Sequence, residues 1–419
     1  MKKFIINGPA ELSGTITISG SKNAALPILA ACLLTEEEVV LRNVPKLKDI
    51  ETMVKLLRCL GAQVIEEYPI IRVPAGRKKK YTAPYNIVKT MRGSFCVLGP
   101  LLARLKKAKV SLPGGCVIGV RPVDLHIKGI SALGADIKLE NGYVYAKAKD
   151  LRGTDVYLGG MFGSSVLATA NVMMCAVLAK GRTIIENAAC EPEIVDLSNM
   201  LTSMGAKISG AGSPWIEIEG VERLGGVDYT IIPDRIEAGT YIMAGAITKS
   251  QIRLKGIELQ HLGAVLDVLK RCGIEVKGRK NGQVNVSENI KAQNIATLPY
   301  PGFPTDLQAQ FVALMSVADG TSVITERIYP DRFMHVPELN RMGANIKREG
   351  PYCVVQGVRE LIGAPVMASD LRASAALVIA GLAAKGRTEV HRIYHLERGY
   401  ENMIEKLQKV GADIKEAFD

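Results

Sequence analysis

A lone thiol, Cys116, lies in the segment SLPGGCVIGVRPVDLHI at residues 111–127. The Pro-Gly-Gly run before it cannot continue a helix or a central strand without losing hydrogen bonds and conformational entropy. We therefore expect residues 111–121 to form a mobile surface loop. A thiol there could donate a proton or attack an electrophile, and a nearby guanidinium such as that of Arg121 favours the reactive thiolate. The alternative is a flexible turn in which the cysteine has no chemical role.

The other cysteines contrast with Cys116, and none of the eight lies in a CxxC pair or at Cys/His ligand spacing. This pattern argues against a disulfide framework and against a zinc site. We therefore expect no metal, no cofactor and a reducing compartment. Five cysteines in apolar helical runs or at helix ends are expected to be buried: Cys32, Cys59, Cys96, Cys175 and Cys272.

Three cations stand at the predicted starts of apolar helices, namely Lys22, Arg92 and Arg372. The N-terminus of a helix carries partial positive charge and normally attracts Asp or Glu, so a cation there is unusual. Any one of them can be a chance occurrence. The three together favour anion sites, where backbone N–H groups and a cationic side chain bind one phosphate or carboxylate.

The elements that carry these residues form a sixfold repeat. In each unit a helical pattern ends at a glycine and an alternating strand follows, and successive glycines are 68 to 73 residues apart. Glycine ends a helix by taking the left-handed conformation. The six glycines are Gly61, Gly134, Gly205, Gly273, Gly343 and Gly411.

Each repeat also contains a second helix that is apolar on nearly every face, which predicts that it is buried. We expect these helices to be capped by Ser21, Thr90, Ser164, Asp234, Thr305 and Ser369, with capping boxes from Asp234 to Glu237 and from Thr305 to Gln308. A repeat of this size indicates two domains of three units each, with a boundary near residues 220–229.

The length and composition of the chain favour a two-domain protein that binds small anions. A chain of 419 residues is too long for one ordinary core, and a net charge of +11 requires an anionic partner. Aromatic residues are scarce and the dense basic run at residues 77–80 is expected to be a solvated loop, so small anionic substrates are favoured over nucleic acid. A basic nucleic-acid-binding or scaffold protein remains the alternative from another class.

Neither a secretory signal nor a membrane span is expected. The N-terminus has an apolar run of only four residues before Gly-Pro. Residues 156–179 carry no charge, but glycines and serines open this stretch and Asn171 lies in its middle, which favours a buried helix behind a polar loop. We expect a cytoplasmic protein that is a monomer or a weak oligomer.

Many separate segments resemble the enolpyruvyl transferase family, and most closely its members that act on UDP-N-acetylglucosamine. Together they cover essentially the whole chain. Besides the Cys116 segment they are SGSKNAALP (19–27), TMRGSFCVLGPLLAR (90–104), ENAACEPEIVDL (186–197), PDRIEAGTY (233–241), YPGFPTDLQAQFVAL (300–314), DRFMHVPEL (331–339), SDLRASAALVIAGL (369–382) and RIYHLERGYE (392–401).

The resemblance implies an α/β fold of two inside-out domains, each with three repeated units, central buried helices and outer sheets. The first domain would span residues 22–229 and carry the nucleotide sugar side and the Cys116 loop. The second would comprise residues 1–21 and 230–419. Phosphoenolpyruvate and UDP-N-acetylglucosamine would bind between them, in the first committed step of peptidoglycan synthesis.

The resemblance also implies roles. The sugar 3-hydroxyl adds to C2 of phosphoenolpyruvate while C3 gains a proton, and loss of phosphate then restores the double bond. Cys116 would be the general acid, able to form a covalent adduct and to be alkylated by the epoxide fosfomycin. Asp306 would be the base, although on residues alone it is an ordinary acid of a first helical turn. Lys22, Arg121 and Arg398 would hold phosphoenolpyruvate.

Further substrate contacts are implied by matching motifs. They are Asn23, Arg92, Arg121, Pro122, Val123, Asp124, Leu125, Asp306 and Ile328 for the nucleotide sugar, and Arg332, Asp370 and Arg372 in the inter-domain set. His126 is either a ligand contact or a structural residue.

One segment departs from the family pattern. The family usually has a sequence like SVGAT at the third buried helix, whereas this chain has GGMFGSSVLAT, with Leu167 in place of the glycine. We assign Ser165 and Val166 to the substrate there. Because serines bind phosphate in the related 5-enolpyruvylshikimate-3-phosphate synthases, that activity is the alternative enzyme.

Overall fold

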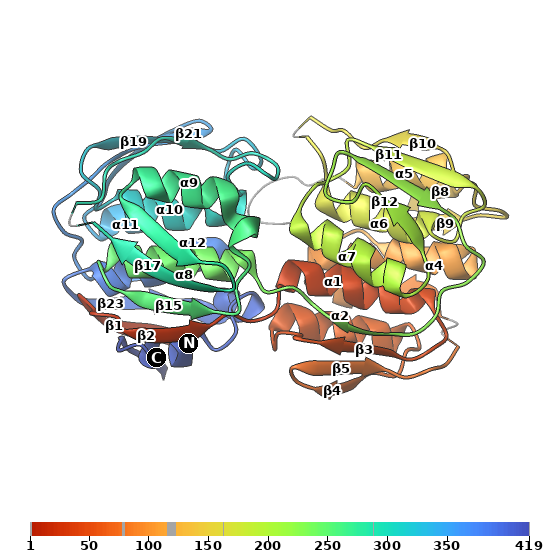
Figure 1. Ribbon diagram of the computed structural model, residues 1–419, viewed down its shortest axis with the longest axis horizontal. Helices are drawn as coiled ribbons and strands as arrows, with labels where there is room; N and C mark the ends of the chain where they lie inside the picture. The colour runs from red at the N-terminus through yellow and green to blue at the C-terminus, as the bar shows by residue number, and fades with distance from the viewer. Residues whose placement is uncertain (1, 78–79, 115–122, 162, 288, 419) are drawn as a thin grey trace. The chain divides into compact units, whose positions relative to one another are not determined.

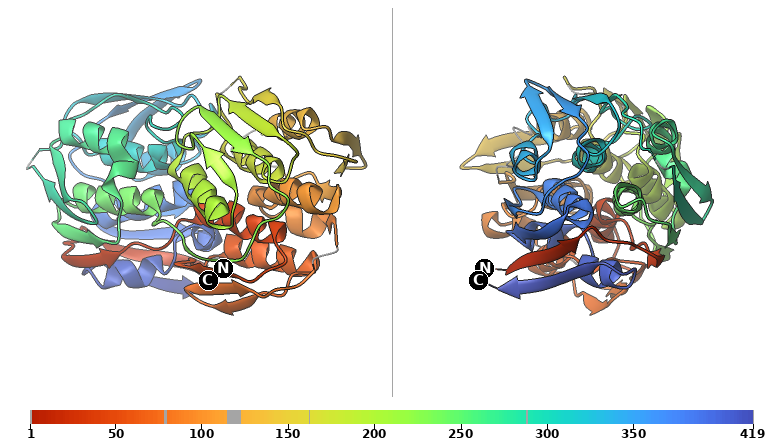
Figure 2. Two further views of the ribbon diagram at one scale, coloured as in Figure 1. Left: turned by 45° about the vertical axis from the view of Figure 1, so that its right-hand side comes forward. Right: turned by 90° about the vertical axis from the view of Figure 1, so that its left-hand side faces the viewer.

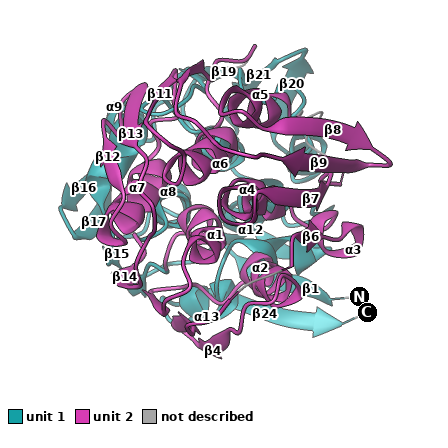
Figure 3. Cartoon of the chain, turned by 90° about the vertical axis from the view of Figure 1, so that its right-hand side faces the viewer, with its two compact units in different colours: residues 1–19, 117–119, 233–419 teal, residues 20–116, 120–232 magenta. Residues whose placement is uncertain are grey.

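The structure is a computed structural model that describes residues 2–77, 80–114, 123–161, 163–287 and 289–418. Its described residues divide into two compact units. Unit 1 comprises residues 2–19 and 233–418, and unit 2 comprises residues 20–114 and 123–232 (Figure 3). The chain therefore passes between the units at residues 19–20 and 232–233. The N-terminal segment belongs to the same unit as the C-terminal half.

The described residues form six four-stranded sheets with one shared topology. In each sheet an edge strand runs parallel to its neighbour and the other pairs are antiparallel. The sheets of unit 2 are β14 (Val227–Thr230)–β3 (Val39–Arg42)–β5 (Ile70–Val73)–β4 (Ile65–Glu67), β6 (Thr82–Ala83)–β7 (Lys107–Ser111)–β9 (Tyr143–Lys147)–β8 (Asp136–Glu140), and β10 (Asp155–Tyr157)–β11 (Arg182–Glu186)–β13 (Trp215–Glu219)–β12 (Lys207–Ser209).

Unit 1 repeats this arrangement with help from the N-terminal segment. Its sheets are β2 (Gly14–Thr17)–β15 (Ile252–Lys255)–β17 (Asn281–Val286)–β16 (Ile274–Gly278), β18 (Ile295–Ala296)–β19 (Thr321–Thr325)–β21 (Tyr352–Gln356)–β20 (Asn345–Glu349), and β22 (Pro365–Met367)–β23 (Gly386–His391)–β1 (Lys2–Gly8)–β24 (Asp413–Phe418). Lys2 pairs with Phe418, so the two ends of the described chain lie side by side (Figure 2).

Apolar helices fill the inside of each unit, with the sheets outside them (Figures 1 and 2). They are almost wholly buried because they present apolar residues on every face. In unit 2 they are α1 (Lys22–Ala31) with η1 (Cys32–Leu34), η2 (Arg92–Val97) with α4 (Leu98–Leu105), and α6 (Val166–Ala176); in unit 1 they are α8 (Arg235–Ile247), η4 (Thr305–Leu307) with α10 (Gln308–Met315), and α12 (Leu371–Ala383). Among the described residues, no helix is both long enough and apolar enough to cross a membrane.

The other helix of each repeat, outside the apolar set, is the one predicted to end at a glycine. These helices are α2 (Lys48–Cys59), α5 (Asp124–Ala132), α7 (Pro192–Ser203), α9 (Gly263–Arg271), α11 (Val336–Arg341) and α13 (Met403–Gln408). All six glycines have positive φ, between 86° and 101°, so the prediction of left-handed helix ends is confirmed. Short helices α3 (Tyr85–Val88), η3 (Leu259–Leu262) and η5 (Ile393–Arg398) complete the set.

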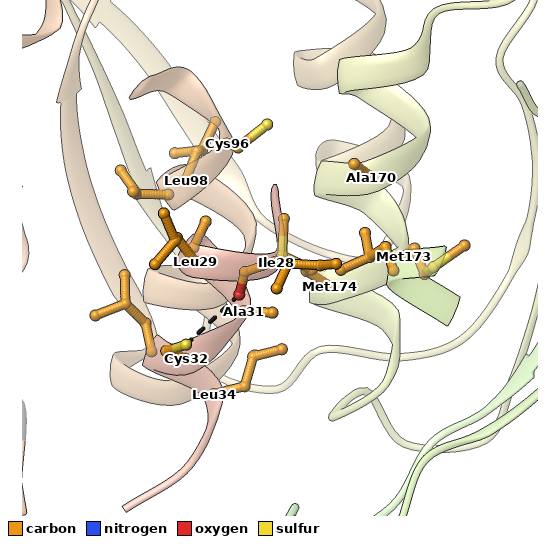
Figure 4. Packing of buried hydrophobic residues seen from close by; sticks show 14 of the residues in the cluster. Ile28, Leu29, Ala31, Cys32, Leu34, Cys96, Leu98, Ala170, Met173 and Met174 are labelled. Atoms are coloured by element: carbon orange, nitrogen blue, oxygen red, sulfur yellow. Dashed lines mark hydrogen bonds between the residues drawn. The ribbon is translucent and has the colours of Figure 1, made fainter. Parts of the chain in front are cut away.

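Each unit has its own apolar core. In unit 2 side chains of α1 pack against those of α6 and of the η2–α4 segment (Figure 4). Cys32, Cys96, Cys175 and Cys272 are buried as predicted. The prediction for Cys59 was wrong, because it ends the amphipathic helix α2 and is partly exposed.

Only two of the six predicted caps are confirmed in their helices: Ser21 accepts from the backbone N–H of Ala24, and Asp234 accepts from those of Ile236 and Glu237. The capping box from Asp234 is only half formed: Asp234 accepts the N–H of Glu237, but the Glu237 carboxylate accepts the N–H of Ser19, and the N–H of Asp234 donates to the carbonyl of Ser19.

The other four predicted caps are wrong. The caps are Ser165 instead of Ser164 and Asp370 instead of Ser369, one residue further along in each case. Met91 and Pro304 precede η2 and η4 without a side-chain cap, so neither Thr90 nor Thr305 caps, and the box from Thr305 to Gln308 is absent from these described residues.

Candidate active site

In unit 1 the carboxylate of Asp306 lies between two buried arginines. Arg332 Nη1 donates to Asp306 Oδ1 at 2.8 Å, and Arg372 Nη2 donates to Oδ2 at 2.9 Å. The arginine side chains are 5% and 2% exposed, whereas that of Asp306 is 27% exposed. One carboxylate is thus fixed by two cations and still reaches solvent.

The contacts with Asp306 affect the pKa values of Arg332 and Arg372. Burial is the largest single effect and lowers the pKa of Arg372, but the charge of Asp306, the groups of Tyr400 and Asp234 and the hydrogen bond to Asp306 together outweigh burial, so the net pKa is raised. Burial also lowers the pKa of Arg332, and the charges of Asp306 and Asp370 with the hydrogen bond to Asp306 outweigh burial there, so its net pKa is raised too. Both guanidinium groups therefore stay charged although they are almost out of water. Arg372 Nε and Nη1 and Arg332 Nε have no hydrogen-bond partner among the described residues, so donors remain for an anion.

A buried polar cluster of Tyr400, Thr240 and Gln310 contacts Arg372 and the backbone of Asp306. The Arg372 guanidinium lies 5.4 Å from the ring centroid of Tyr400. The Tyr400 hydroxyl is 2.8 Å from Thr240 Oγ1, and Gln310 Nε2 donates to that hydroxyl and to the carbonyl of Asp306, both at 3.1 Å. The cluster fixes the backbone of Asp306 and one face of Arg372 together. Motif matching did not single out Thr240 or Gln310.

Asp370 and Arg372 occupy the start of α12. The Asp370 carboxylate accepts from the N–H groups of Arg372 and Ala373 at 2.8 and 3.1 Å, which caps the helix. Burial lowers the pKa of the nearby His335 well below its ordinary value; Asp370 raises it and Arg332 lowers it. Arg398 ends η5, which packs on α12. The structure thus gathers most of the predicted cations of unit 1 around α12.

The predicted contact Ile328 lies on a loop held by a carboxylate that motif matching missed. Glu326 is fully buried and its Oε1 accepts the N–H of Ile328 at 2.8 Å and of Tyr329 at 3.0 Å. The same Oε1 accepts from Thr297 Oγ1 at 2.6 Å. Its Oε2 accepts from Thr305 Oγ1 at 2.9 Å. No local sequence signal points to Glu326, because its partners lie up to 29 residues away.

In unit 2, Lys22 and Asn23 begin α1 directly after the Ser21 cap. Lys22 is only 9% exposed, and its Nζ lies 3.4 Å from Asp49 Oδ2 of α2, itself 4% exposed. Asp49 was not predicted as a site residue. Its carboxylate holds the ammonium group at the helix start, where an anion would meet both the cation and the partial positive charge of the helix N-terminus.

His126 proves to be a structural residue of unit 2. It is 2% exposed, its Nδ1 lies 2.9 Å from Asn171 Nδ2, and its ring meets Phe95 edge-on. Asn171 also donates to the carbonyl of Phe95 and accepts from the N–H of Gly99, so the pair ties α5, α6, η2 and α4 together. Burial, helped by the charge of Arg92, lowers the pKa of His126 to about 3, so the ring is neutral and its Nδ1 accepts a hydrogen bond from Asn171 Nδ2.

Of the remaining predicted residues of unit 2, Arg92 begins η2, and the others lie at the starts of two helices that pack on each other, α5 and α6. Val123 precedes α5, and Asp124 and Leu125 open it. Leu125 lies beside Gly160, which exchanges backbone hydrogen bonds of 2.9 and 3.1 Å with Gly163. Ser165 caps α6 and Val166 is its first residue. In Figure 3 the buried helices α1, α4 and α6 are seen end-on in the middle of unit 2.

Cys116, Arg121 and Pro122 lie outside the described residues. Two surface grooves of unit 2, of about 580 and 480 Å³, contain none of the predicted site residues. Within each unit, the described candidate residues therefore include side chains at helix starts: in unit 1 a carboxylate bound by two cations, and in unit 2 a buried ammonium group. Such groups can take a proton from a hydroxyl and bind carboxylate or phosphate.

The comparisons with known proteins agree with this chemistry. Residues 6–407 match the family described as EPSP synthase (3-phosphoshikimate 1-carboxyvinyltransferase). A UDP-N-acetylglucosamine 1-carboxyvinyltransferase of Methylacidiphilum infernorum is 55% identical over 419 residues, covering 100% of this chain and 99% of that protein. One from Coxiella burnetii is 53% identical over 420 residues, covering 99% and 96%.

Solved structures show the same fold. The enolpyruvyl transferase NikO from Streptomyces tendae superposes with a TM-score of 0.90 at 26% identity, covering 99% of both chains. An EPSP synthase from Acinetobacter baumannii superposes with a TM-score of 0.77 at 17% identity over the whole of both chains, a likeness that concerns the fold alone.

Proposed function

The chain belongs to the EPSP synthase family of carboxyvinyltransferases, and we propose that it transfers the enolpyruvyl group of phosphoenolpyruvate to the 3-hydroxyl of UDP-N-acetylglucosamine. The observation that carries this proposal is the 55% identity over its full length to a protein of that name. The chain is thus a transferase, and the product serves peptidoglycan synthesis.

The proposed chemistry assigns the hydroxyl proton to Asp306. The sugar oxygen bonds to C2 of phosphoenolpyruvate as Asp306 takes its proton, and Cys116 gives a proton to C3. The intermediate then loses one proton from C3 to the Cys116 thiolate as the bond from C2 to the phosphate oxygen breaks, which restores the double bond, and Asp306 passes the hydroxyl proton to the leaving phosphate. The two arginines support this role because they hold the carboxylate in one orientation at 2.8 and 2.9 Å.

Cations bind the acidic substrate in this proposal. Lys22, Arg121 and Arg398 hold the carboxylate and phosphate of phosphoenolpyruvate, and the buried position of Lys22 strengthens its field. The nucleotide sugar is bound by Asn23, Arg92, the segment 121–125, Ser165, Val166 and Ile328, with Arg332, Asp370 and Arg372 nearby. We also propose a cytoplasmic monomer or weak oligomer.

Cys116 can be tested by alkylation. We expect fosfomycin to add covalently once to the wild-type chain and not to Cys116→Ala, because the thiolate opens the epoxide. Mass spectrometry of the intact protein measures the adduct, and Cys59→Ala, which removes a partly exposed thiol elsewhere, is the matched control. An adduct that survives in Cys116→Ala would remove the assignment.

The function itself is tested by phosphate release from phosphoenolpyruvate with three acceptor conditions: UDP-N-acetylglucosamine, shikimate 3-phosphate, and neither. Release with the nucleotide sugar alone is expected. Release with shikimate 3-phosphate alone would favour the second candidate, which the description of the family model and the serines of the 159–167 loop suggest. Tight binding of RNA or DNA without phosphate release would favour a non-catalytic basic protein.

A further inference from the structure

We infer that Glu326 is a positioning residue for the reaction, acting on Asp306 through Thr305 and Arg332. The inference rests on the proposed function, in which Asp306 is the base. Glu326 does not contact Asp306 itself. Glu326 fixes the direction in which the Thr305 hydroxyl group donates its hydrogen. The oxygen of that hydroxyl group is then available to accept a hydrogen bond from Arg332, next to Asp306.

The chain of contacts begins with a hydroxyl that has a single hydrogen. Thr305 Oγ1 donates this hydrogen to Glu326 Oε2 at 2.9 Å. Its oxygen lone pairs therefore remain for Arg332 Nη1, which donates to it at 3.0 Å. The same Nη1 donates to Asp306 Oδ1 at 2.8 Å. Arg332 is thus held between a hydroxyl oxygen and the carboxylate oxygen, with its guanidinium in one place.

The other oxygen of Glu326 makes the arrangement directional. Oε1 accepts from Thr297 Oγ1 and from the N–H groups of Ile328 and Tyr329, so three donors converge on it. An amide at position 326 must therefore turn its oxygen to this side. Its NH2 group then faces Thr305, which can no longer donate to it. The Thr305 hydroxyl must reverse, and its hydrogen then points toward Arg332, which is itself a donor.

Glu326→Gln is consequently a selective perturbation. It keeps the volume of the side chain and the bonds to the 328–329 loop, and it breaks only the branch through Thr305. We expect kcat to fall about 10-fold, the effect of one lost charge-assisted hydrogen bond, because Arg332 no longer fixes Asp306. We expect the KM for UDP-N-acetylglucosamine to change less than about twofold, since Ile328 stays bound to position 326.

A double-mutant cycle separates this positioning role from a general structural one. Thr305→Val should lower kcat by a similar factor, and Thr305→Ser, which keeps the hydroxyl group, should restore it. In the Thr305→Val background Glu326→Gln should cost little further, because both changes break one chain of contacts. Thr388→Val is the control, since Thr388 is also fully buried, lies in β23 and has no hydroxyl partner among the described residues.

The experiment measures kcat and KM by phosphate release, with thermal unfolding to confirm that each variant is folded. Equal kcat in wild type and Glu326→Gln would overturn the inference, and so would fully multiplicative losses in the double variant. If wild type used shikimate 3-phosphate instead, the proposed substrate would be wrong, and the same cycle on that acceptor would test Glu326. No release by wild type with either acceptor would overturn the proposed function and this inference with it.

Discussion

The buried histidine of unit 2 predicts how stability depends on pH. His126 has a pKa of about 3 in the folded protein, against 6.5 in the unfolded chain. Its folded pKa is depressed, so the unfolded chain binds a proton more readily, and the fold loses stability as pH falls through 6.5 toward 3. Integrated between pH 7 and pH 5, this histidine costs about 2 kcal/mol of the free energy of unfolding.

A second group in the same unit acts in the opposite direction. Asp196 is 1% exposed, and burial raises its pKa from 3.8 to about 6, against the hydrogen bonds from Tyr229 and Ile232, while the charge of Glu193 adds to the rise. Its folded pKa is raised, so protonation favours the fold, and between pH 7 and pH 5 it returns about 1 kcal/mol. Unfolding of the wild type alone would therefore show only the difference between the contributions of His126 and Asp196 to the free energy of unfolding.

The variant His126→Gln isolates the histidine, because its amide oxygen can still accept from Asn171 but does not titrate. Trp215 is the one tryptophan of the chain and lies in β13 of unit 2, so its fluorescence during urea unfolding follows that unit. We expect the loss between pH 7 and pH 5 to be about 2 kcal/mol smaller in His126→Gln than in wild type. Equal losses in the two proteins would refute the claim that His126 is buried and neutral.

Two further predictions concern the site and the backbone. Asp306→Asn should lower kcat, measured by phosphate release, by about 10²-fold or more because the base is lost. It should also destabilise unit 1, measured by calorimetry, because Arg332 and Arg372 lose their counter-charge. A kcat within about threefold of wild type, which is on the order of experimental scatter, would contradict the assignment. Gly205→Ala should cost only about 1 kcal/mol, because Gly205 of unit 2 has φ of 101° but open space around it. Gly99→Ala should cost several times more in the same urea titration, since its Cβ would lie 2.2 Å from the carbonyl oxygen of Asn171, and the reverse order would count against the packing of α4 on α6.

The repeat could be predicted from the sequence because its signals are local. Gly205 or Gly411 ends a helix through its own backbone conformation, and an all-apolar helix such as α12 is buried whatever surrounds it. Caps were harder to predict when two capping residues are adjacent. Asp370 rather than Ser369 caps α12, and only the path of the backbone decides between them.

Contacts between distant residues could not be predicted in this way. The sequence around Thr305 is typical of a helix cap, but its hydroxyl group instead donates a hydrogen bond to Glu326, 21 residues later. Asp49 reaches Lys22 only because α2 packs on α1. The resemblance to the enolpyruvyl transferases supplied the role of Asp306, since a lone acid in a first helical turn has no sequence signal for catalysis.

The most direct test of the account is the identity of the product. The chain is incubated with phosphoenolpyruvate and UDP-N-acetylglucosamine, and the nucleotide sugar is then analysed by mass spectrometry while phosphate is counted. We predict that the nucleotide sugar gains one enolpyruvyl group for each phosphate released. An unchanged nucleotide sugar, with shikimate 3-phosphate converted in its place or no acceptor converted at all, would contradict the proposed function.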